Sequence, residues 1–454
     1  MTEPASETPP GPVASDAHGS PRRRRRLLFW LAIAVGGLLL CVLLVVAAWL
    51  LFVPGDIPEV DDGDLLLAEE SIPEEENGYT LLEQACAALD TTEEFGWSFD
   101  LLDSAPDELD ESESEEVEEL RSSGWVESVL EINREALTLV EKACSRPRMR
   151  LPLGFDGPFS EITTLSRLLL LRSWELRGHG RDEESLADIL MLLRLGRMLR
   201  GGRGPLITHV VGAFFVGRAH VELRESLEVF DLSCTRLREL AGSLDTPAEI
   251  QQSFADALRG DYSLFRRIVE EFAGGDRNVD LDLSPFEQRI SRLLLQPNRT
   301  RQVLADQLRR PIQTRDRHYS KMLLPEMPEE LTHEDKLKAI LSGNPVGIVF
   351  LAAFMPAVET AARKKCHATI SLHATRIHLA LACYQQEHGE LPPDLEALVP
   401  DYLDAVPLDD FDGKPMRYSA EKKIVYSVGR DLIDSGGEEG FSTGEGDHVY
   451  PIGF

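Results

Sequence analysis

The segment that decides the fold class runs from Ile162 to Phe230 and reads ITTLSRLLLLRSWELRGHGRDEESLADILMLLRLGRMLRGGRGPLITHVVGAFFVGRAHVELRESLEVF. Its leucines, and later its valines and phenylalanines, recur every three or four residues, which is the spacing of one face of an α-helix. Glycine-rich breaks at 178–180 and 201–205 divide it into three helical stretches. Because short turns between helices of this length make neighbours antiparallel, the pattern predicts a body built of helical hairpins.

Helical periodicity continues on both sides of this segment. Towards the N-terminus it begins near Gly78, and an amphipathic helix is expected from Trp125 to Cys144. Towards the C-terminus, residues 246–249 read TPAE, which is the signature of a capping box with proline at the first helical position. We therefore expect a helical domain over residues 78–345.

The longest apolar run, Leu27 to Val53, contains no charged residue. As an α-helix it would extend about 40 Å, enough to cross a hydrocarbon core of about 30 Å. A cleaved signal peptide has a shorter apolar core of about 7–15 residues, so we expect an uncleaved transmembrane helix. The arginines at 22–26 precede the run, which predicts a cytoplasmic N-terminus and an exported remainder. Residues 1–26 are expected to be a disordered cytoplasmic tail, and residues 54–77 an acidic linker.

The chain has 454 residues and a formal net charge of -31 at pH 7. Such an excess of carboxylates disfavours nucleic acid and anionic lipid as partners of the exported part, and it favours basic proteins or divalent cations. Arg194, Arg197, Arg200 and Arg203 are an exception, because they form a basic edge on the helical segment. These arginines either pair with carboxylates of the chain or bind an acidic partner.

The chain has six cysteines, of which Cys41 lies in the apolar run. The other five are odd in number, widely spaced and without a Cys-x-x-Cys pair, which is not the pattern of a disulfide framework. Two alternatives remain. Either one bridge forms, for which Cys86 and Cys144 are candidates, or the thiols are buried and free.

The pattern changes after residue 345. A short apolar run ends before Pro356, and one long helix is expected from there to His388, with Gly389 as its C-terminal stop. The remainder alternates with a period of two, so we expect a mainly α protein with a small α+β domain over residues 346–454. The predicted strands, about three and antiparallel, are at 414–419, 423–428 and 448–452.

Two runs of the C-terminal part, ATRIHLALACYQQEHGELPPDLEALVPDYLDAVPLDDFDGKPMRY at 374–418 and IVYSVGRDLIDSGG at 424–437, carry a recognisable order of motifs. This order resembles the globular head of the major pseudopilin of type II secretion. In that family a helix ending in Tyr, then Asn or His, then Gly precedes a Pro-x-x-Leu turn, a Val-Pro-x-Asp-x-Phe-Gly segment and a Tyr-Ser-x-Gly-x-Asp loop. The matching residues are Tyr384, His388-Gly389, Pro392 to Leu395, Val406 to Gly413 and Tyr426 to Asp431, within about the last 90 residues.

The resemblance implies that the C-terminal loop binds calcium, which is the one cofactor expected. By position, the implied ligands are Asp431, Asp434 and Asp447, together with the carbonyl of Val428. Calcium binds about six to eight carboxylate and carbonyl oxygens, so the residue types fit. The alternative is that these aspartates only form turns. Leu432 departs from the family, which has glycine at this position.

Other features depart from a pilus subunit. The run from Leu27 to Val53 follows arginines rather than a processing site and contains no glutamate, and about 290 residues separate it from the tail. The chain therefore looks like a membrane-anchored bacterial envelope protein that carries a pseudopilin-like tail. The resemblance implies a single-pass protein of the inner (cytoplasmic) membrane, with its bulk in the periplasm.

No HExxH, GxSxG, Walker or dinucleotide-binding motif is present. His367, His373 and His378 are six and five residues apart on the expected long helix, whereas metal ligands on one helix face are about three or four apart. We therefore expect a non-enzymatic scaffold or protein-interaction protein that works beside type II secretion or a pilus-like machine. The alternative is an enzyme whose site lies in the helical body, in a cleft where carboxylates of shifted pKa converge.

Overall fold

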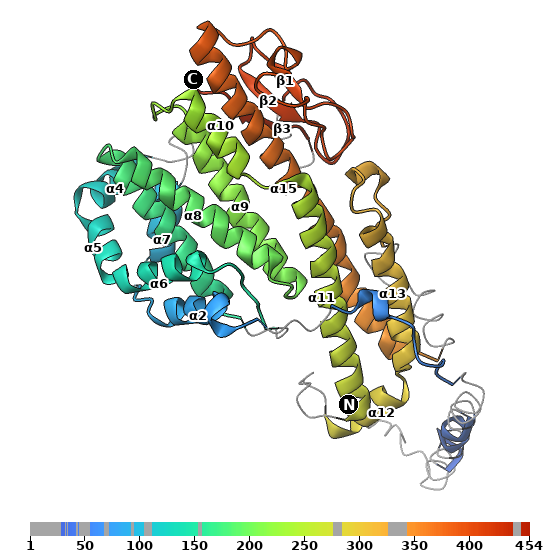
Figure 1. Cartoon of the computed structure of the whole chain (residues 1–454). Coiled ribbons are helices and arrows are strands. Elements are labelled where there is room, and N and C mark those ends of the chain that lie inside the picture. Colours follow the sequence, from blue (N-terminus) through green and yellow to red (C-terminus); the bar gives the residue numbers. More distant parts are fainter. Residues whose placement is uncertain are drawn as a thin grey trace, which may run out of the picture. The chain divides into compact units, whose positions relative to one another are not determined.

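The computed structural model describes residues 55–67, 72–91, 95–103, 111–152, 157–275, 284–325, 343–438 and 446–454, and parts of the segment 29–44. These residues are mainly helical, with a three-stranded antiparallel sheet near the C-terminus (Figure 1). The predicted fold class, mainly α with a small sheet in the tail, is confirmed at this level.

The predicted helical hairpins are present. Helices α7 (Phe159–Gly178), α8 (Asp182–Gly201) and α9 (Leu206–Ser226) follow one another and pack side by side (Figure 1). Helices α8 and α9 approach closely at two glycines. A Cβ atom at Gly196 would lie 2.7 Å from the carbonyl oxygen of Gly212, so neither position has room for a side chain. The leucines between the three helices form the largest apolar cluster.

The single helix predicted from Trp125 to Cys144 is wrong, because Asn133 interrupts it. The buried Asn133 side chain donates to the Asp90 carbonyl (2.9 Å) and accepts from the Asp90 amide (2.9 Å). A side chain that bonds a distant backbone competes with helix continuation. The helices of this region are α2 (Tyr79–Ala87), α3 (Phe95–Asp103), α4 (Glu111–Ser122), α5 (Trp125–Ile132) and α6 (Arg134–Ser145).

The capping box at Thr246 is confirmed, since its hydroxyl accepts from the Glu249 amide and the Glu249 carboxylate accepts from the Thr246 amide. A second capping box, formed by Ser284 and Glu287, opens a later helix. The helices of this part are α10 (Cys234–Ser243), α11 (Pro247–Gly274), α12 (Pro285–Leu293) and α13 (Pro297–Gln313), and short 3-10 turns occur at Glu74–Glu76, Tyr319–Lys321 and Glu396–Leu398.

Residues 56–65, which we call the strap, differ from the expected acidic linker because they pack against α11 and α13. Leu65, in the 3-10 turn Gly63–Leu65, is buried in the apolar cluster of these helices. Asp56 accepts hydrogen bonds from the amides of Asn298 and Arg299 at the start of α13. A carboxylate at this place satisfies unpaired N–H groups and the positive end of the helix dipole.

Asp62 is the central residue of the strap. Its buried carboxylate accepts from the Tyr262 hydroxyl (2.5 Å), from Arg301 (2.8 Å) and from Arg266 (3.2 Å). Burial raises the pKa of Asp62, but the hydrogen bonds from Arg301 and Tyr262 lower it by more, so the pKa lies below its ordinary value. The strap is therefore held by charge as well as by Leu65.

Helix α15 (Pro345–His388) is longer than predicted because it continues through Pro356. The proline is exposed and removes one backbone hydrogen bond without ending the helix. Gly389 stops the helix in the left-handed conformation, as predicted. Helix α15 contributes side chains to all three apolar clusters. Its first half packs beside α11 and α13 through Leu351, Met355 and Val358. Its second half packs beside α7 to α10 on one face, through Leu372, Leu379 and Cys383, and beside the sheet on another, through Ile370, Ile377 and Leu381.

The three predicted strands are confirmed as β1 (Arg417–Ser419), β2 (Ile424–Ser427) and β3 (His448–Pro451). They pair antiparallel in the order β1-β2-β3, with Val425 opposite Tyr418 on one side and Tyr450 on the other. Val425 is buried against α15 in the tail cluster.

The predicted transmembrane helix lies only partly within the described residues, and the predicted tail 1–26 lies outside them. The described residues between Phe29 and Leu44 are helical, and their large apolar side chains are exposed. Helices α9 and α15 are also long and apolar enough to cross a membrane by length and composition. Both contribute side chains to apolar clusters of the folded body, so their composition is weak evidence for a membrane span.

Candidate functional site

Two adjoining cavities of the helical body have arginine as nearly all of their charged lining residues. One, of about 470 Å³, lies between residues 147–150 and the end of α8; the other, of about 590 Å³, lies between the end of α6 and α8. They share Pro147, Arg197 and Met198. We call them together the arginine groove, whose charged lining residues are Arg148, Arg150, Arg194, Arg197, Arg203 and Glu141.

The first wall of the groove is an extended segment pinned by backbone hydrogen bonds. The Gly78 amide donates to the Arg148 carbonyl (2.8 Å), and the Arg148 amide donates to the Glu76 carbonyl (3.3 Å). The Arg150 amide donates to the Asn77 side chain (2.8 Å). Both arginines of this wall therefore have a fixed backbone.

The opposite wall is the turn between α8 and α9, where Arg203 has a left-handed backbone with φ 54°. This conformation is uncommon for a residue other than glycine. The turn has no room to relax, because a Cβ atom at Gly202 would lie 2.9 Å from the Leu151 side chain and one at Gly260 would overlap the Gly204 carbonyl. Packing therefore forces the conformation of Arg203, and such residues concentrate at functional sites.

The arginines expected to form a basic edge divide into two groups. Arg197 and Arg200 share one buried carboxylate, Asp245, at 2.8 Å and 3.0 Å, and Arg197 also donates to the Ser243 carbonyl (2.6 Å). For these two, pairing with a carboxylate of the chain is confirmed.

Arg194 lacks this neutralisation among the described residues. Arg194 is exposed and donates to the Arg146 carbonyl (3.3 Å), which carries no net charge. Within the described part of the chain, neither Arg194 nor Arg150 forms an ion pair. The one acid of the lining, Glu141, pairs with Arg172 (2.9 Å). The groove therefore carries net positive charge on an acidic protein.

Two histidines of α9 lie near these arginines and add no charge. His209 and His220 are fully buried, and burial lowers the pKa of His209 to about 3 and that of His220 well below its ordinary value. The charge of Arg200 acts in the same direction on both. Because guanidinium groups do not titrate near neutrality, the charge of the groove does not change with physiological pH.

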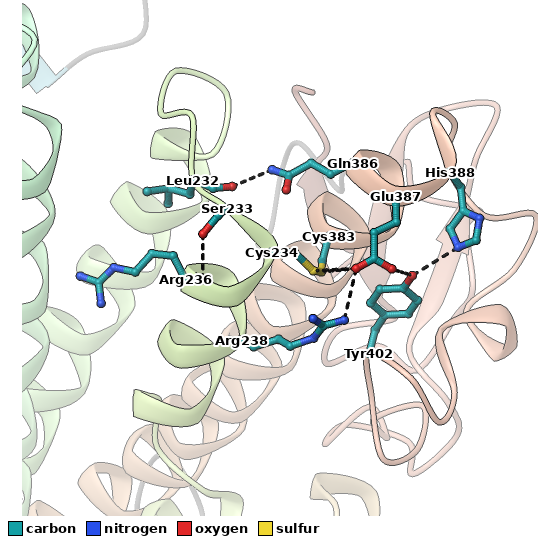
Figure 2. The surroundings of a disulfide bond; sticks show 10 residues. All are labelled: Leu232, Ser233, Cys234, Arg236, Arg238, Cys383, Gln386, Glu387, His388 and Tyr402. Carbon is teal, nitrogen blue, oxygen red and sulfur yellow. Dashed lines mark hydrogen bonds and ion pairs between the residues drawn. A yellow bond between two sulfur atoms is a disulfide. The ribbon is translucent and has the colours of Figure 1, made fainter.

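A disulfide joins the body to the tail, between Cys234 of α10 and Cys383 of α15 (Figure 2). Their Cα atoms are 4.9 Å apart, within the usual range for such a bond. The suggested pair Cys86 and Cys144 is wrong: both are buried free thiols, and burial raises the pKa of each to about 12. The real pair is separated by 149 residues, so local spacing contained no sign of it.

A polar network surrounds the disulfide (Figure 2). The Tyr402 hydroxyl donates to Glu387 (2.5 Å), which raises the pKa of Tyr402 to about 12, and Gln386 donates to the Leu232 carbonyl (2.7 Å). Glu387 and the two sulfur atoms lie within 4.8 Å of one another, a spacing that could hold a metal ion. In the disulfide, however, the sulfurs offer no thiolate, and Arg238 already pairs with Glu387 at 3.5 Å.

A buried arginine strengthens the junction deeper in the molecule. Arg224 of α9 donates to the Thr375 hydroxyl (2.7 Å) on α15 and lies over the Tyr450 ring of β3 at 4.9 Å. Burial lowers the pKa of this guanidinium, which nevertheless stays charged. The body and the tail are therefore joined by a covalent bond and by polar contacts of buried groups.

Asp409, which the sequence reasoning missed, organises the loops of the tail. Its buried carboxylate accepts from the Phe411 amide (2.9 Å), the Val428 amide (3.0 Å), the Ser427 hydroxyl (2.9 Å) and Arg417 (2.6 Å). It stands at the aspartate of the Val-Pro-x-Asp segment. Its place in the Val-Pro-x-Asp segment was the signal in the sequence that could have identified it.

The candidate calcium ligands are close in sequence but are used mainly in turns. Asp431 accepts from the Ile433 amide (2.9 Å), and Asp434 accepts from the Gly436 amide (3.1 Å) and the Tyr426 hydroxyl (3.2 Å). Asp434 also lies 3.6 Å from Arg417. These contacts favour structural roles for the two residues.

Asp447 fits a cation better. One oxygen accepts from the Ser435 and Gly437 amides, whereas the other is buried and has no hydrogen-bond partner among the described residues. The three aspartates do not form a ligand group within the described part of the chain. The Val428 amide donates to Asp409, and this contact does not tell whether the Val428 carbonyl binds calcium.

Leu432, which stands where the pseudopilin heads that the tail resembles have glycine, has an unusual backbone conformation. Leu432 has a left-handed backbone with φ 60°, although its side chain makes the conformation unfavourable. Leu432 and Ile433 are 41% and 61% exposed, so two adjacent apolar side chains protrude from the tail. The loop tip is therefore both strained and apolar on its surface.

The histidines of α15 do not converge. His373 bonds the Leu408 carbonyl and His378 bonds the Pro451 carbonyl, at 2.8 Å and 2.9 Å, while His367 packs against other rings of the tail. Burial lowers the pKa of all three. They therefore act as neutral residues of the core.

Several carboxylates with raised pKa belong to ion pairs rather than to a cleft. Asp261 is an exception, since burial raises its pKa to about 6 and its carboxylate accepts from the Leu206 amide (2.8 Å). Burial raises the pKa of Glu222, which accepts from Trp174 (2.9 Å) and Arg218 (3.1 Å). Burial also raises the pKa of Asp103, which pairs with the same Arg218 at 2.6 Å. Neither residue lines the arginine groove.

Comparison with models of known families, with characterised proteins and with solved structures found no match to this chain.

Proposed function

We propose that this chain is a membrane-anchored, non-enzymatic interaction protein of the bacterial envelope. Residues 27–53 hold it in the inner membrane with its N-terminus in the cytoplasm, and it works beside type II secretion or a pilus-like machine. The strap supports the anchoring, because the packed body begins at Asp56, three residues after Val53. The secretion context rests on the resemblance of the tail.

The observation that carries the proposal is the way α15 is used. From Lys365 to Cys383 this helix is buried on nearly all sides by the chain's own body and sheet, and Cys234–Cys383 and Arg224 join the two parts. A helix buried in this way is not available to pack with neighbouring subunits, so the tail serves as a docking surface rather than as a filament unit. Its sheet and loops, including Leu432 and Ile433, are what it can present to a partner.

An enzymatic role has no comparable support within the described residues. It needs a cleft with converging carboxylates of raised pKa. Glu222 and Asp103 have raised pKa values but are already bound by Arg218. Asp261, whose pKa burial raises to about 6, is bound by the Leu206 amide, and no second carboxylate converges on it among the described residues. We therefore propose the interaction function rather than an enzymatic one.

The test is a pull-down of the detergent-solubilised full-length protein. Deleting the tail is unsuitable, because α15 belongs to the cores of the body. The variant is Leu432→Gly with Ile433→Ser, which removes the exposed apolar tip and relieves the left-handed leucine. The control is Val229→Ser, an equally exposed apolar residue of the body (63%). We expect secretion components with the wild type and the control but not with the variant; a result in which no component depends on the tip contradicts the proposal.

Calcium remains the proposed cofactor of the tail loop, with Asp447 as its main ligand. The buried, unpartnered oxygen of Asp447 supports this assignment. Calorimetry of the full-length protein would show calcium-dependent heat that is lost in Asp447→Asn. Absence of heat at millimolar calcium would exclude the site.

A further inference from the structure

We propose that the arginine groove binds a carboxylate-rich segment of a partner protein. The inference deepens the proposed interaction function and rests on it, because it names the chemistry of one partner surface. It concerns the helical body and is independent of the tip at Leu432 and Ile433.

The first argument is charge. The groove is lined by five arginines and one glutamate, in a chain with 78 acidic and 47 basic residues. That glutamate, Glu141, is bound by Arg172, and Arg197 shares Asp245 with Arg200. Arg150 and Arg194 have no ion pair within the described part of the chain. A positive surface on so acidic a protein attracts acidic partners and repels basic ones.

The second argument is the residue type. All the cations of the groove are arginines, whose planar guanidinium groups bind carboxylates through two parallel hydrogen bonds. Arginine is also favoured over lysine at protein interfaces. The same side chains also bind phosphate, so geometry has to decide between the two.

The third argument is geometry. The cations do not converge on one point, because they come from the segment 147–150, from α8 and from the turn that follows it. They line two adjoining cavities of about 470 Å³ and 590 Å³. Charges spaced along a groove match acidic side chains spaced along a peptide better than a compact phosphate. Backbone hydrogen bonds at Arg148 and the packed turn at Arg203 hold the backbone of both residues in place.

The test uses the full-length protein in detergent and a fluorescein-labelled oligoglutamate peptide, with anisotropy as the readout. The variant is Arg150→Glu with Arg194→Glu. The control is Arg134→Glu with Arg181→Glu, which changes the charge equally at two exposed arginines outside the groove. We expect the variant to weaken peptide binding at least about tenfold and the control to change it little. Binding of the wild type should also weaken as salt is raised, because the attraction is electrostatic.

Three results would overturn the inference. They are no binding of the peptide to the wild type, equal binding by the variant and the control, and tighter binding of inorganic polyphosphate than of the peptide. Thermal unfolding of each variant shows that it remains folded. Loss of the tail-dependent partner in the pull-down, with oligoglutamate binding intact, would count against the proposed secretion role alone.

Discussion

Arginines cluster at two places, around the strap and in the arginine groove, but they meet different partners. At the strap, Arg301 pairs with Asp62 at 2.8 Å and Arg309 pairs with Asp64 at 2.7 Å. In the groove, Arg194 contacts only a backbone carbonyl among the described residues. The arginines at the strap are therefore neutralised within the chain, whereas Arg150 and Arg194 of the groove form no ion pair among the described residues.

The difference separates structural charges from charges available to a partner. Arg301 and Asp62 are both 6% exposed as side chains, so either would be costly to leave alone in the interior. Arg194 is exposed to water and needs no partner for stability. Mutations at the strap should therefore change stability, and mutations in the groove should change binding.

The largest effect is expected for Asp62→Ala. This change removes the buried carboxylate that binds Arg301, Arg266 and Tyr262 and leaves Arg301 only its pair with Glu270 (3.2 Å), so it should lower the free energy of unfolding by about 3 kcal/mol. Urea unfolding of the full-length protein measures it. Tyr262→Phe, which removes one hydrogen bond to the same carboxylate, should cost only about 1 kcal/mol. Equal stability of Asp62→Ala and the wild type would show that the ion pairs at the strap are not needed for stability.

The disulfide Cys234–Cys383 is a covalent contact between distant residues, and its contribution to the free energy of unfolding can be compared with that of the strap. Cys234→Ala removes a bond between residues 149 apart and should lower the free energy of unfolding by about 2–4 kcal/mol. Cys86→Ala, at a buried free thiol, is the control for loss of a sulfur atom. If a reducing agent destabilises the wild type no more than the Cys234→Ala variant, the bond does not contribute.

The pH dependence should distinguish the two arginine clusters. The pKa of Asp62 is lowered in the folded protein, so its contribution to stability is present above the ordinary aspartate pKa of about 4 and is lost as the pH falls through the folded value. The stability difference between wild type and Asp62→Asn should therefore shrink in acid. Peptide binding by the groove should stay constant between about pH 6 and 8, because arginines do not titrate there.

The smallest effect is expected for Arg150→Ala and Arg194→Ala. Neither side chain has an ion pair within the described residues, so each change should shift the free energy of unfolding by less than about 0.5 kcal/mol. The same urea experiment measures it. A loss of several kcal/mol would show that these arginines are structural, as at the strap.

Much of the helical body could be predicted because its signals are local. The breaks at 178–180 and 201–205 separate α7, α8 and α9, and the TPAE capping box marks the first turn of α11. The strands were found through alternation over four to six residues. Asn133 was missed because its break depends on Asp90, which lies 43 residues away in the chain.

The candidate sites could be predicted only in part. The arginines at 194–203 were recognised as a basic edge, since their spacing places them along one helix. The other wall of the groove, with Arg148 and Arg150, comes from a segment that the sequence shows only as a helix end. Which arginines are neutralised depends on Asp245, and no local pattern marks that partner.

The sequence alone indicated most of the helices, the three strands, the capping box at Thr246, and that one long run is apolar enough for a bilayer. These properties depend on contacts within a few residues. Only the tertiary structure decided that Cys234 pairs with Cys383, that Asp62 binds Arg301 across 239 residues, and that α15 serves three cores. The physical reason is that burial and charge pairing depend on which distant segments pack together, and periodicity does not encode that choice.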